Sequence, residues 1–368
     1  MILSPYDTTE LNHGGKVDLS GIINFLKELE HEILLIAIDR NDVVTKEGIT
    51  SKRKKYWRYI FSFSKYPYMA YSRQINQHQK KAIYRFNPDI VFIMTEFMLP
   101  AYLQLKNLSH HKTILRRANN EKLYLKSLLS FTNPFLSIYR LLEITKMNFL
   151  QEVIMKTRIN LTIDIAPTGV PAPSQIVISG PINSRKKEYS EFRRQEQYDF
   201  GYIGSLNLPN AKQGITWFIE SVVPEIQSRL PGVRIMIAGK NPGYSLKKKC
   251  KKSGILLFAN PADVTHLNEE IKVFVNPVFK GSGVNMKLLT PIKLKKPIVS
   301  TFFGARGFPE IDNEFGTAND SASFAKLCLK IHRDPINSQF HANQVLDAYN
   351  NRINHIYKLI EAELNSCS

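Results

Sequence analysis

Apolar and polar residues alternate along the first half of the chain with two different periods. Short apolar runs, typical of buried strands, lie at residues 1–6, 32–38, 89–94, 113–116, 160–166 and 176–179. Between them, apolar residues recur at helical spacing over residues 17–29, 66–86 and 119–156, the last interrupted near Asn133. Strands of this kind, alternating with helices, are typical of a parallel sheet covered on both faces. The pattern therefore predicts an α/β fold for this half.

A polar stretch over residues 180–198 has no hydrophobic period and is the best candidate for a linker. After it, strands are predicted at residues 200–204, 233–239, 255–258, 272–275 and 297–300, and helices at 211–228, 244–252, 262–270, 287–293, 324–332 and 338–363. The chain is therefore expected to form two Rossmann-like parallel-sheet domains, at residues 1–180 and 199–337, facing a cleft. A closing helix within residues 338–368 is expected to return toward the N-terminal domain.

The composition narrows the class of protein without changing the predicted fold. A chain of 368 residues suits two domains, and an apolar fraction of 43% can fill their cores. Cys250, Cys328 and Cys367 lack metal-binding spacing and cannot all pair, which favours a reducing compartment. No apolar run is long enough to span a membrane, and the N-terminus lacks the pattern of a signal peptide. We therefore expect a cytoplasmic protein.

The basic charge is concentrated in one segment, which we expect to be helical. The net charge is +18, and residues 52–85 hold ten Lys or Arg and no acidic residue, with aromatic residues interleaved from Tyr56 to Tyr71. This combination fits an anionic membrane surface that presents a lipid-linked acceptor, but it also fits a solvated helical insertion or a nucleic-acid site. No recognisable nucleic-acid motif accompanies the segment. We therefore expect a membrane surface as a partner and no nucleic acid.

Glycines follow several predicted strands, and the richest cluster is at residues 281–283. Gly281, Ser282 and Gly283 leave the backbone open where a helix is predicted to start, and Lys287 lies one turn inside that helix. Free N–H groups and the helix dipole favour an anion there. The segment predicts a seat for a diphosphate, although an ordinary turn with a tight glycine fits it too. Glycines at positions 14, 15, 204 and 239 also follow predicted strands, which indicates one shared cleft.

Several motifs of the C-terminal half occur in a fixed order. They include Tyr202-Ile-Gly-Ser-Leu, Gly214-Ile-Thr-Trp-Phe, Arg234-Ile-Met-Ile-Ala-Gly-Lys and the run from Val273 to Leu289. Together they resemble the nucleotide-binding domain of GT-B glycosyltransferases, especially glycosyltransferase family 4, over residues 199–335. The N-terminal half fits the family's landmarks more loosely, at Ser4-Pro-Tyr, His13-Gly-Gly, Pro88-Asp-Ile-Val and Asn119-Asn-Glu.

The resemblance implies that the C-terminal domain holds a nucleotide sugar, linked to UDP or GDP, and that the N-terminal domain holds the acceptor. Such enzymes typically need no metal, and no cofactor besides the substrate is expected. Basic side chains and backbone N–H groups would then offset the diphosphate charge. The candidate diphosphate residues are Gly204, Ser205, Gly281, Ser282, Gly283 and Lys287, and the candidate nucleoside residues are Phe258, Asn260 and Thr290. Gly14 and Gly15 would form an acceptor-side loop.

Four positions depart from the family pattern. The family usually has Glu at the positions of Ser282 and Thr290, a basic residue at that of Ser205 and Lys at that of Asn210. Loss of one ribose contact would cost on the order of 1–3 kcal/mol of donor binding. Two functions therefore stay open: an active transferase with its own donor contacts, or a noncatalytic GT-B partner subunit.

His13 and Glu121 are the candidate catalytic bases by position, because an inverting transfer needs a base near the acceptor hydroxyl. The structural alternatives are a loop histidine bonded to backbone and a carboxylate at a helix start. A retaining transfer, which the family generally performs, needs no such base. The resemblance thus implies a hexosyl- or other glycosyltransferase, of the retaining type, acting on a lipid-linked or saccharide acceptor. Its products would be surface polysaccharide or glycolipid, such as capsule or lipopolysaccharide, made peripherally at the inner face of the cytoplasmic membrane.

Overall fold

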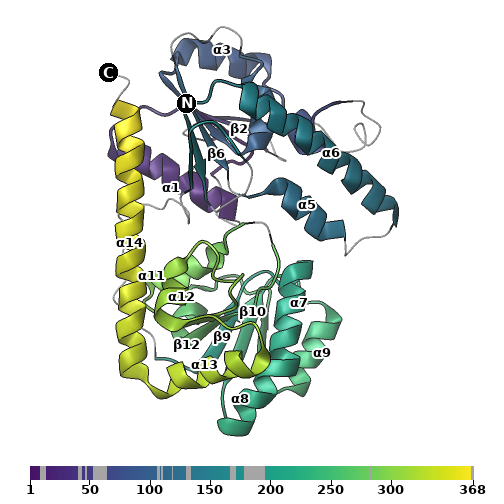
Figure 1. Ribbon diagram of the computed structural model, residues 1–368, viewed down its shortest axis with the longest axis vertical. Helices are drawn as coiled ribbons and strands as arrows, with labels where there is room; N and C mark the ends of the chain where they lie inside the picture. Colours follow the sequence, from purple (N-terminus) through teal and green to yellow (C-terminus); the bar gives the residue numbers. More distant parts are fainter. Residues whose placement is uncertain are drawn as a thin grey trace. The chain divides into compact units, whose positions relative to one another are not determined.

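The chain divides into two compact units in the computed structural model (Figure 1). The first unit comprises Met1–Lys187 and Ile356–Ser368, and the second comprises Glu188–His355. The structure describes residues 1–8, 14–39, 44–45, 48–52, 64–105, 108, 111–117, 119–129, 134–165, 171–177, 195–281 and 283–365. Each unit is built around its own sheet, as the α/β pattern of the sequence predicts.

The described part of the first unit contains an eight-stranded sheet with the order β3-β4-β2-β1-β5-β6-β7-β8. Its strands are β1 (Ile2–Ser4), β2 (Leu35–Asp39), β3 (Val44–Thr45), β4 (Gly48–Lys52), β5 (Ile90–Met94), β6 (Lys112–Arg117), β7 (Leu161–Asp164) and β8 (Gln175–Val177). Neighbouring strands pair in parallel, except that β3 is antiparallel to β4. The hydrophobic pattern misses β3 and β4 because they contain too few apolar residues to form a run.

Helices connect the strands of the first unit. They are α1 (Gly14–Glu28), α2 (Tyr68–Tyr71), α3 (Gln77–Phe86), α4 (Leu99–Tyr102), α5 (Glu121–Leu129) and α6 (Pro134–Lys156), with a 3-10 turn η2 (Glu96–Met98) before α4. The prediction of one continuous helix over residues 66–86 is wrong, because a new helix begins after Asn76. The Asn76 side chain accepts a hydrogen bond from the Gln79 N–H at 2.8 Å, and the Gln79 side chain accepts one from the Asn76 N–H at 3.1 Å. This capping box satisfies N–H groups at a helix start.

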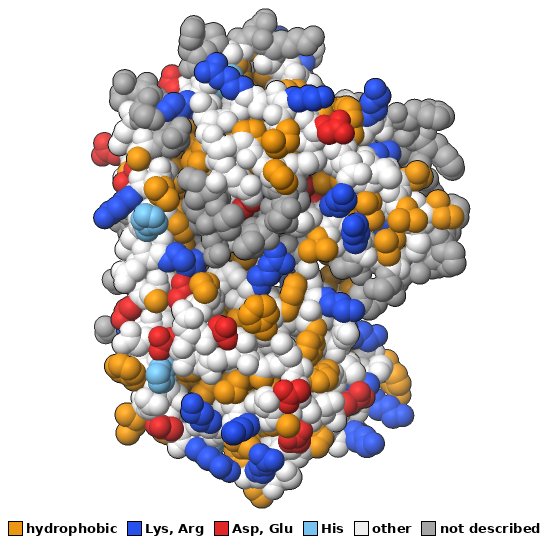
Figure 2. All heavy atoms as spheres, viewed as in Figure 1, with side chains coloured by type: hydrophobic (Ala, Val, Ile, Leu, Met, Phe, Trp, Pro, Cys, Tyr) orange, Lys and Arg blue, Asp and Glu red, His pale blue; other side chains and the backbone are white. Residues whose placement is uncertain are grey.

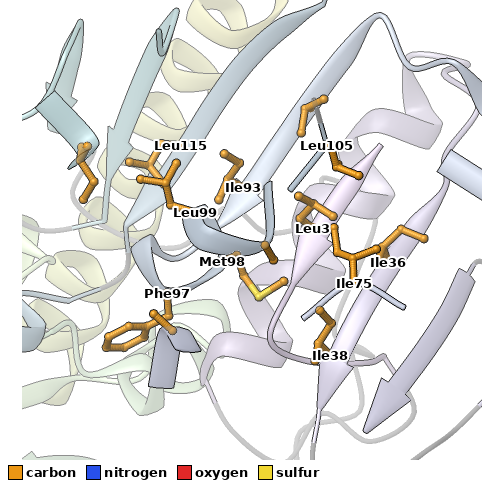
Figure 3. Packing of buried hydrophobic residues seen from close by; sticks show 14 of the residues in the cluster. Leu3, Ile36, Ile38, Ile75, Ile93, Phe97, Met98, Leu99, Leu105 and Leu115 are labelled. Carbon is orange, nitrogen blue, oxygen red and sulfur yellow. The ribbon is translucent and has the colours of Figure 1, made fainter. Parts of the chain in front are cut away.

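The core of the first unit is formed by side chains of neighbouring strands. Figure 3 shows Leu3, Ile36, Ile93 and Leu115, which come from β1, β2, β5 and β6, and all four are fully buried. Strands that bury apolar residues without interruption need cover on both faces, which explains why the strand segments could be predicted from apolar runs.

The second unit has a five-stranded parallel sheet with the order β11-β10-β9-β12-β13. Its strands are β9 (Tyr198–Ile203), β10 (Ile235–Gly239), β11 (Leu256–Ala259), β12 (Ile271–Asn276) and β13 (Ile298–Ser300). Its helices are α7 (Pro209–Trp217), α8 (Val223–Arg229), α9 (Tyr244–Lys252), α10 (Thr265–Glu270), α11 (Leu289–Lys293), α12 (Pro309–Phe315) and α13 (Ser321–Arg333), with a π-helical turn η3 (Phe218–Val222) between α7 and α8 and a 3-10 turn η4 (Met286–Leu288) before α11. The Trp217 ring packs edge-on against Phe279 and Phe324, at 4.7 and 5.4 Å between centroids.

The closing helix is α14 (Pro335–Asn365). Its residues up to His355 belong to the second unit, and those from Ile356 belong to the first. Within the first unit, Tyr357 stacks on Phe25 of α1 with 4.3 Å between ring centroids. In the ranges described here, no helix combines the length and apolar character that a membrane span requires.

Candidate functional site

The loops that follow β9, β10 and β11 meet at one edge of the second sheet. The Gly204 N–H donates to the Ala238 carbonyl at 3.0 Å, and the Asn260 N–H donates to the Gly239 carbonyl at 2.9 Å. A Cβ at position 239 would lie 1.8 Å from the Gly204 carbonyl oxygen, so a side chain does not fit there. This edge holds the carboxyl ends of parallel strands, where open α/β sheets bind ligands.

Lys287 extends to the end of β9. Its Nζ donates a hydrogen bond to the Tyr202 hydroxyl at 2.8 Å and lies 4.5 Å from the centre of the Tyr202 ring. Tyr202 is 2% exposed, so the cation is held by a fixed, buried partner. A Cβ at position 204 would lie 2.8 Å from the same hydroxyl, which explains the glycine there. The structure therefore brings Gly204 and Lys287, both predicted site residues, to the same place.

Hydrogen bonds from two asparagines fix the glycine-bearing loop after β12. Asn276 Nδ2 donates to Ser300 Oγ at 3.1 Å and to the Gly304 carbonyl at 2.9 Å, and Asn285 Nδ2 donates to the same carbonyl at 2.8 Å. The Asn276 Oδ1 atom is buried and has no hydrogen-bond partner among the described residues. The loop is therefore held at both ends by the segment that follows β13.

Two of the positions that depart from the family pattern make loop contacts: Asn210 contacts the loop after β12, and Ser205 contacts its own loop. Asn210 Nδ2 donates to the Lys280 carbonyl at 3.2 Å, and Ser205 Oγ donates to Asn207 Oδ1 at 2.7 Å. Gly281 lies beside Phe303, since a Cβ on this glycine would be 3.3 Å from the ring. Neutral hydrogen bonds thus shape this edge where the family usually has basic side chains.

The helix expected directly after Gly283 is shorter than the sequence pattern suggests. The backbone first forms the 3-10 turn η4, and α11 has only five residues, so the helix dipole adds little positive charge. The positive charge comes instead from side chains. Besides Lys287, the half-buried Arg306 lies 5.8 Å from the centre of the Phe303 ring, and burial lowers the pKa of its guanidinium. An arginine still carries its charge at neutral pH.

The nucleoside candidates lie on or beside the same sheet. Asn260 has a positive φ of 52°, and its Oδ1 accepts a hydrogen bond from the Asn241 N–H at 2.7 Å, which ties two loops together. Phe258 is half-buried in β11 and packs edge-on against Tyr198, at 5.9 Å between centroids. Thr290 is half-buried in α11. Their contacts to a nucleoside stay predictions.

Two predicted site residues, His13 and Ser282, lie outside the described residues. Gly14 and Gly15 were expected in a loop, but both form the first turn of α1. A Cβ on Gly15 would lie 2.4 Å from the Tyr6 ring, so this glycine allows an aromatic side chain to pack against the helix start. The role of this turn toward a substrate stays a prediction.

Glu121 lines a cavity of about 250 Å³ in the first unit. It begins α5, and Asn119 Nδ2 donates a hydrogen bond to its carboxylate at 3.2 Å. Burial raises the pKa of Glu121 above its ordinary value. A second carboxyl group, that of Glu96, lines the same cavity, and sequence analysis did not select it. Its signal was weak: one acidic residue at the end of an apolar run.

Comparison with known proteins agrees with this architecture. Residues 197–334 match the family model "Glycosyl transferases group 1". The "Uncharacterized 44.6 kDa protein in cps region" of Klebsiella pneumoniae is 26% identical over 365 residues, which cover 88% of each chain. The structure of Anabaena HepE, in complex with UDP and glucose, has a TM-score of 0.63 at 12% identity and covers 99% of both chains. WaaG, a glycosyltransferase of lipopolysaccharide biosynthesis, also has a TM-score of 0.63, at 11% identity, with 98% of this chain and 99% of its own covered.

Two parallel-sheet units, a group 1 domain and similarity over the full length to GT-B structures define the class of this protein. The chain has the GT-B fold, which glycosyltransferases share. More particularly, its residues 197–334 are a domain of the group 1 glycosyl transferases.

Proposed function

We propose that the chain transfers a sugar from a nucleotide-diphosphate donor to a lipid-linked or saccharide acceptor. The observation that carries this proposal is the Lys287 cation, held beside Gly204 at the carboxyl edge of the second sheet. A leaving diphosphate needs such a fixed positive group. UDP or GDP is the proposed nucleotide, and the similarity to HepE, which binds UDP, favours UDP. The transfer is proposed to retain configuration and to need no metal.

The proposed product is a surface polysaccharide or glycolipid. The relative from the cps region of Klebsiella pneumoniae supports a role in capsule synthesis. The similarity to WaaG, described as involved in lipopolysaccharide biosynthesis, supports a lipid-linked acceptor.

A thermal-shift screen with nucleotide sugars tests the donor. We expect one UDP- or GDP-linked sugar to raise the melting temperature of the wild type. The variant Lys326→Met, which removes an exposed lysine on α13, should respond to this sugar in the same way. Slow release of the free sugar from that donor, in the absence of acceptor, would then report the bond cleavage. Binding to none of the donors would favour the alternative of a noncatalytic partner subunit.

We further propose that the protein works peripherally at the inner face of the cytoplasmic membrane. The basic segment 52–85 is described from residue 64 onward and at Lys52, and within it Lys65, Lys81 and Arg85 are exposed. Arg73, in contrast, is buried at 3% exposure and donates to the Met69 carbonyl, so it does not belong to a surface patch. Basic residues near an anionic surface each add attraction of about 1 kcal/mol.

Apolar side chains of α6 support the same proposal. Ile138, Leu141 and Leu142 are 61%, 52% and 54% exposed, and Figure 2 shows apolar and basic side chains intermingled where Figure 1 draws this helix. Exposed apolar groups next to cations suit the surface of an anionic bilayer.

Vesicle sedimentation tests the membrane surface. Wild type is expected to bind phosphatidylglycerol vesicles and not phosphatidylcholine vesicles, and the change Ile138→Ser, Leu141→Ser, Leu142→Ser is expected to reduce binding. Neutralising Lys52 to Lys55 should reduce it as well. Unchanged binding by both variants would reject these surfaces, while the Lys326→Met variant controls for a general loss of charge.

A further inference from the structure

Glu96 occupies a fixed position at the carboxyl end of β5. The preceding residue, Thr95, has φ 74° and ψ 148°, which few non-glycine residues adopt, and its N–H donates to the Arg116 carbonyl at 2.8 Å. The residues after Glu96 are anchored in the core: Phe97 is 7% exposed, and Met98 is fully buried (Figure 3). A strained backbone conformation of this kind persists only where the surrounding structure enforces it.

The cavity next to Glu96 is lined by polar groups of several types. The main ones are Glu96, Glu121, Asn119, Lys122, Asn148 and Gln151. Some of them hold one another: Lys122 Nζ donates to Asn148 Oδ1 at 2.6 Å, and Gln151 Nε2 donates to the Pro171 carbonyl. The volume of about 250 Å³ is below the roughly 300–1,000 Å³ of sites for drug-sized ligands, which suits a single sugar ring.

Among the described residues, no hydrogen bond or ion pair accounts for the burial of the Glu96 carboxyl group. It is 6% exposed, and it makes no hydrogen bond or ion pair with the described residues. Arg117, a cation whose charge acts on Glu96, is held by Asp164 through two hydrogen bonds of 2.7 and 2.8 Å. A buried polar group without a hydrogen bond is costly, so the position of Glu96 beside a cavity points to a partner that binds in that cavity.

The charges around Glu96 favour its neutral form. Burial is the largest effect, and the carboxylates of Glu121 and Asp164 add to it, so the pKa of Glu96 rises to about 8 although Arg117 opposes them. Burial also raises the pKa of Glu121, against the effects of Asn119 and Arg73. At neutral pH, Glu96 therefore carries a proton and can both donate and accept a hydrogen bond.

We propose that this cavity binds the acceptor sugar, and that Glu96 and Glu121 hold adjacent hydroxyl groups of that sugar. Each hydroxyl both donates and accepts, so two neighbouring carboxyl groups, of which that of Glu96 is protonated at neutral pH, complement two neighbouring hydroxyls. The amides of Asn119, Asn148 and Gln151 add further donors and acceptors. The proposal rests on the transferase function, since it names the substrate class of the first unit. Glu96 is a binding residue here, and no proton transfer is assigned to it.

Saturation-transfer NMR with glucose, galactose, mannose and N-acetylglucosamine tests the proposal on the full chain. We expect at least one sugar to give a signal with the wild type and with Glu152→Ala, an exposed carboxylate of α6 outside the cavity lining. Glu96→Ala should weaken binding by about tenfold or more, as expected for a lost hydrogen bond to an uncharged partner in a buried site. Raising the pH through about 8 should weaken wild-type binding, and Glu96→Gln, which cannot ionise, should bind independently of pH.

Three results would overturn the inference. The first is equal sugar binding by the wild type and Glu96→Ala. The second is that no sugar gives a saturation-transfer signal with the wild type. The third is a melting-temperature increase by Mg²⁺ or Ca²⁺ that disappears in Glu96→Ala, which would make the carboxyl pair a cation site. Calorimetry with UDP, which reports on the second unit, separates failure of this inference from failure of the transferase function. A Glu96→Ala variant whose near- and far-UV circular dichroism match those of the wild type is folded in both units, so a misfolded variant cannot mimic the expected loss.

Discussion

The contact between Lys287 and Tyr202 gives the sharpest test of the diphosphate seat. Lys287→Met removes the cation but keeps an unbranched apolar stem of similar length. A hydrogen bond from a charged donor to a phosphate contributes on the order of 1.5–3 kcal/mol. We therefore expect Lys287→Met to weaken UDP binding by about ten- to a hundredfold. Lys287→Met also removes the hydrogen bond between Lys287 and Tyr202. This loss does not itself remove a contact to UDP, because the Tyr202 ring is buried and its hydroxyl is bonded to Lys287.

Tyr202→Phe separates holding the cation from supplying it. The ring stays in place 4.5 Å from Nζ, so the cation–π attraction remains while the hydrogen bond of 2.8 Å is lost. The lysine then becomes less well ordered, and we expect a loss of a few-fold in UDP affinity. In the Lys287→Met background, the same Tyr202→Phe change should have no further effect, because it acts through the lysine.

Isothermal titration calorimetry with UDP, at one fixed ionic strength, measures all four proteins of this double-mutant cycle. Lys326→Met is the matched control, since it removes an exposed lysine of the same unit. Wild-type affinity in Lys287→Met would refute the diphosphate seat. Additive losses in the double variant would refute the argument that Tyr202 acts by positioning Lys287.

Two further changes, one in each unit, test the packing at Gly239 and the ionisation of Glu96. Gly239→Ala would place a Cβ 1.8 Å from the Gly204 carbonyl oxygen, so we expect a loss of about 1–3 kcal/mol in unfolding free energy together with weaker UDP binding, and urea denaturation would show no loss if the contact relaxes freely. For Glu96, the pKa of about 8 in the folded chain exceeds the 4.5 of a free glutamate, so its stability penalty is absent at low pH, grows as the pH rises between these values and is complete above them. Glu96→Gln should therefore be more stable than the wild type by a few kcal/mol at about pH 9 and nearly equal at about pH 4, whereas a difference independent of pH would contradict the assigned ionisation.

Much of the fold could be predicted because its strands and helices are encoded locally. The helix predicted at residues 244–252 has the same bounds in α9, and every predicted strand of the second unit lies on one of its five strands. One of the failures has a long-range cause. The helix predicted to start at Lys287 begins instead as η4, where Asn285 is bonded to the Gly304 carbonyl. No local pattern contains a contact between residues so far apart in sequence.

The residues of the candidate site also divide into those visible in the local sequence and those that depend on distant contacts. Gly204 and Lys287 could be selected from motifs, because glycine after a strand and a lysine at a helix start are visible in the sequence. Tyr202 was missed as a site residue because its role depends on one hydrogen bond to Lys287, across 85 positions. Glu96 was missed because its raised pKa depends first on burial and then on the charges of Glu121 and Asp164, which come from other elements. Charge environments of this kind are tertiary properties.

The departures from the family pattern have a consequence for the chemistry. At the positions where relatives usually carry basic residues, Asn210 holds the Lys280 carbonyl and Ser205 holds Asn207, both through neutral hydrogen bonds. These contacts shape the loops but contribute no charge to a bound diphosphate. In the proposed diphosphate site, Lys287 therefore has to supply a larger share of the positive charge than it would in a site with three cations. For the same reason, an engineered Asn210→Lys should partly restore UDP binding in the Lys287→Met variant, and no recovery would show that position 210 lies too far from the phosphates to act on them.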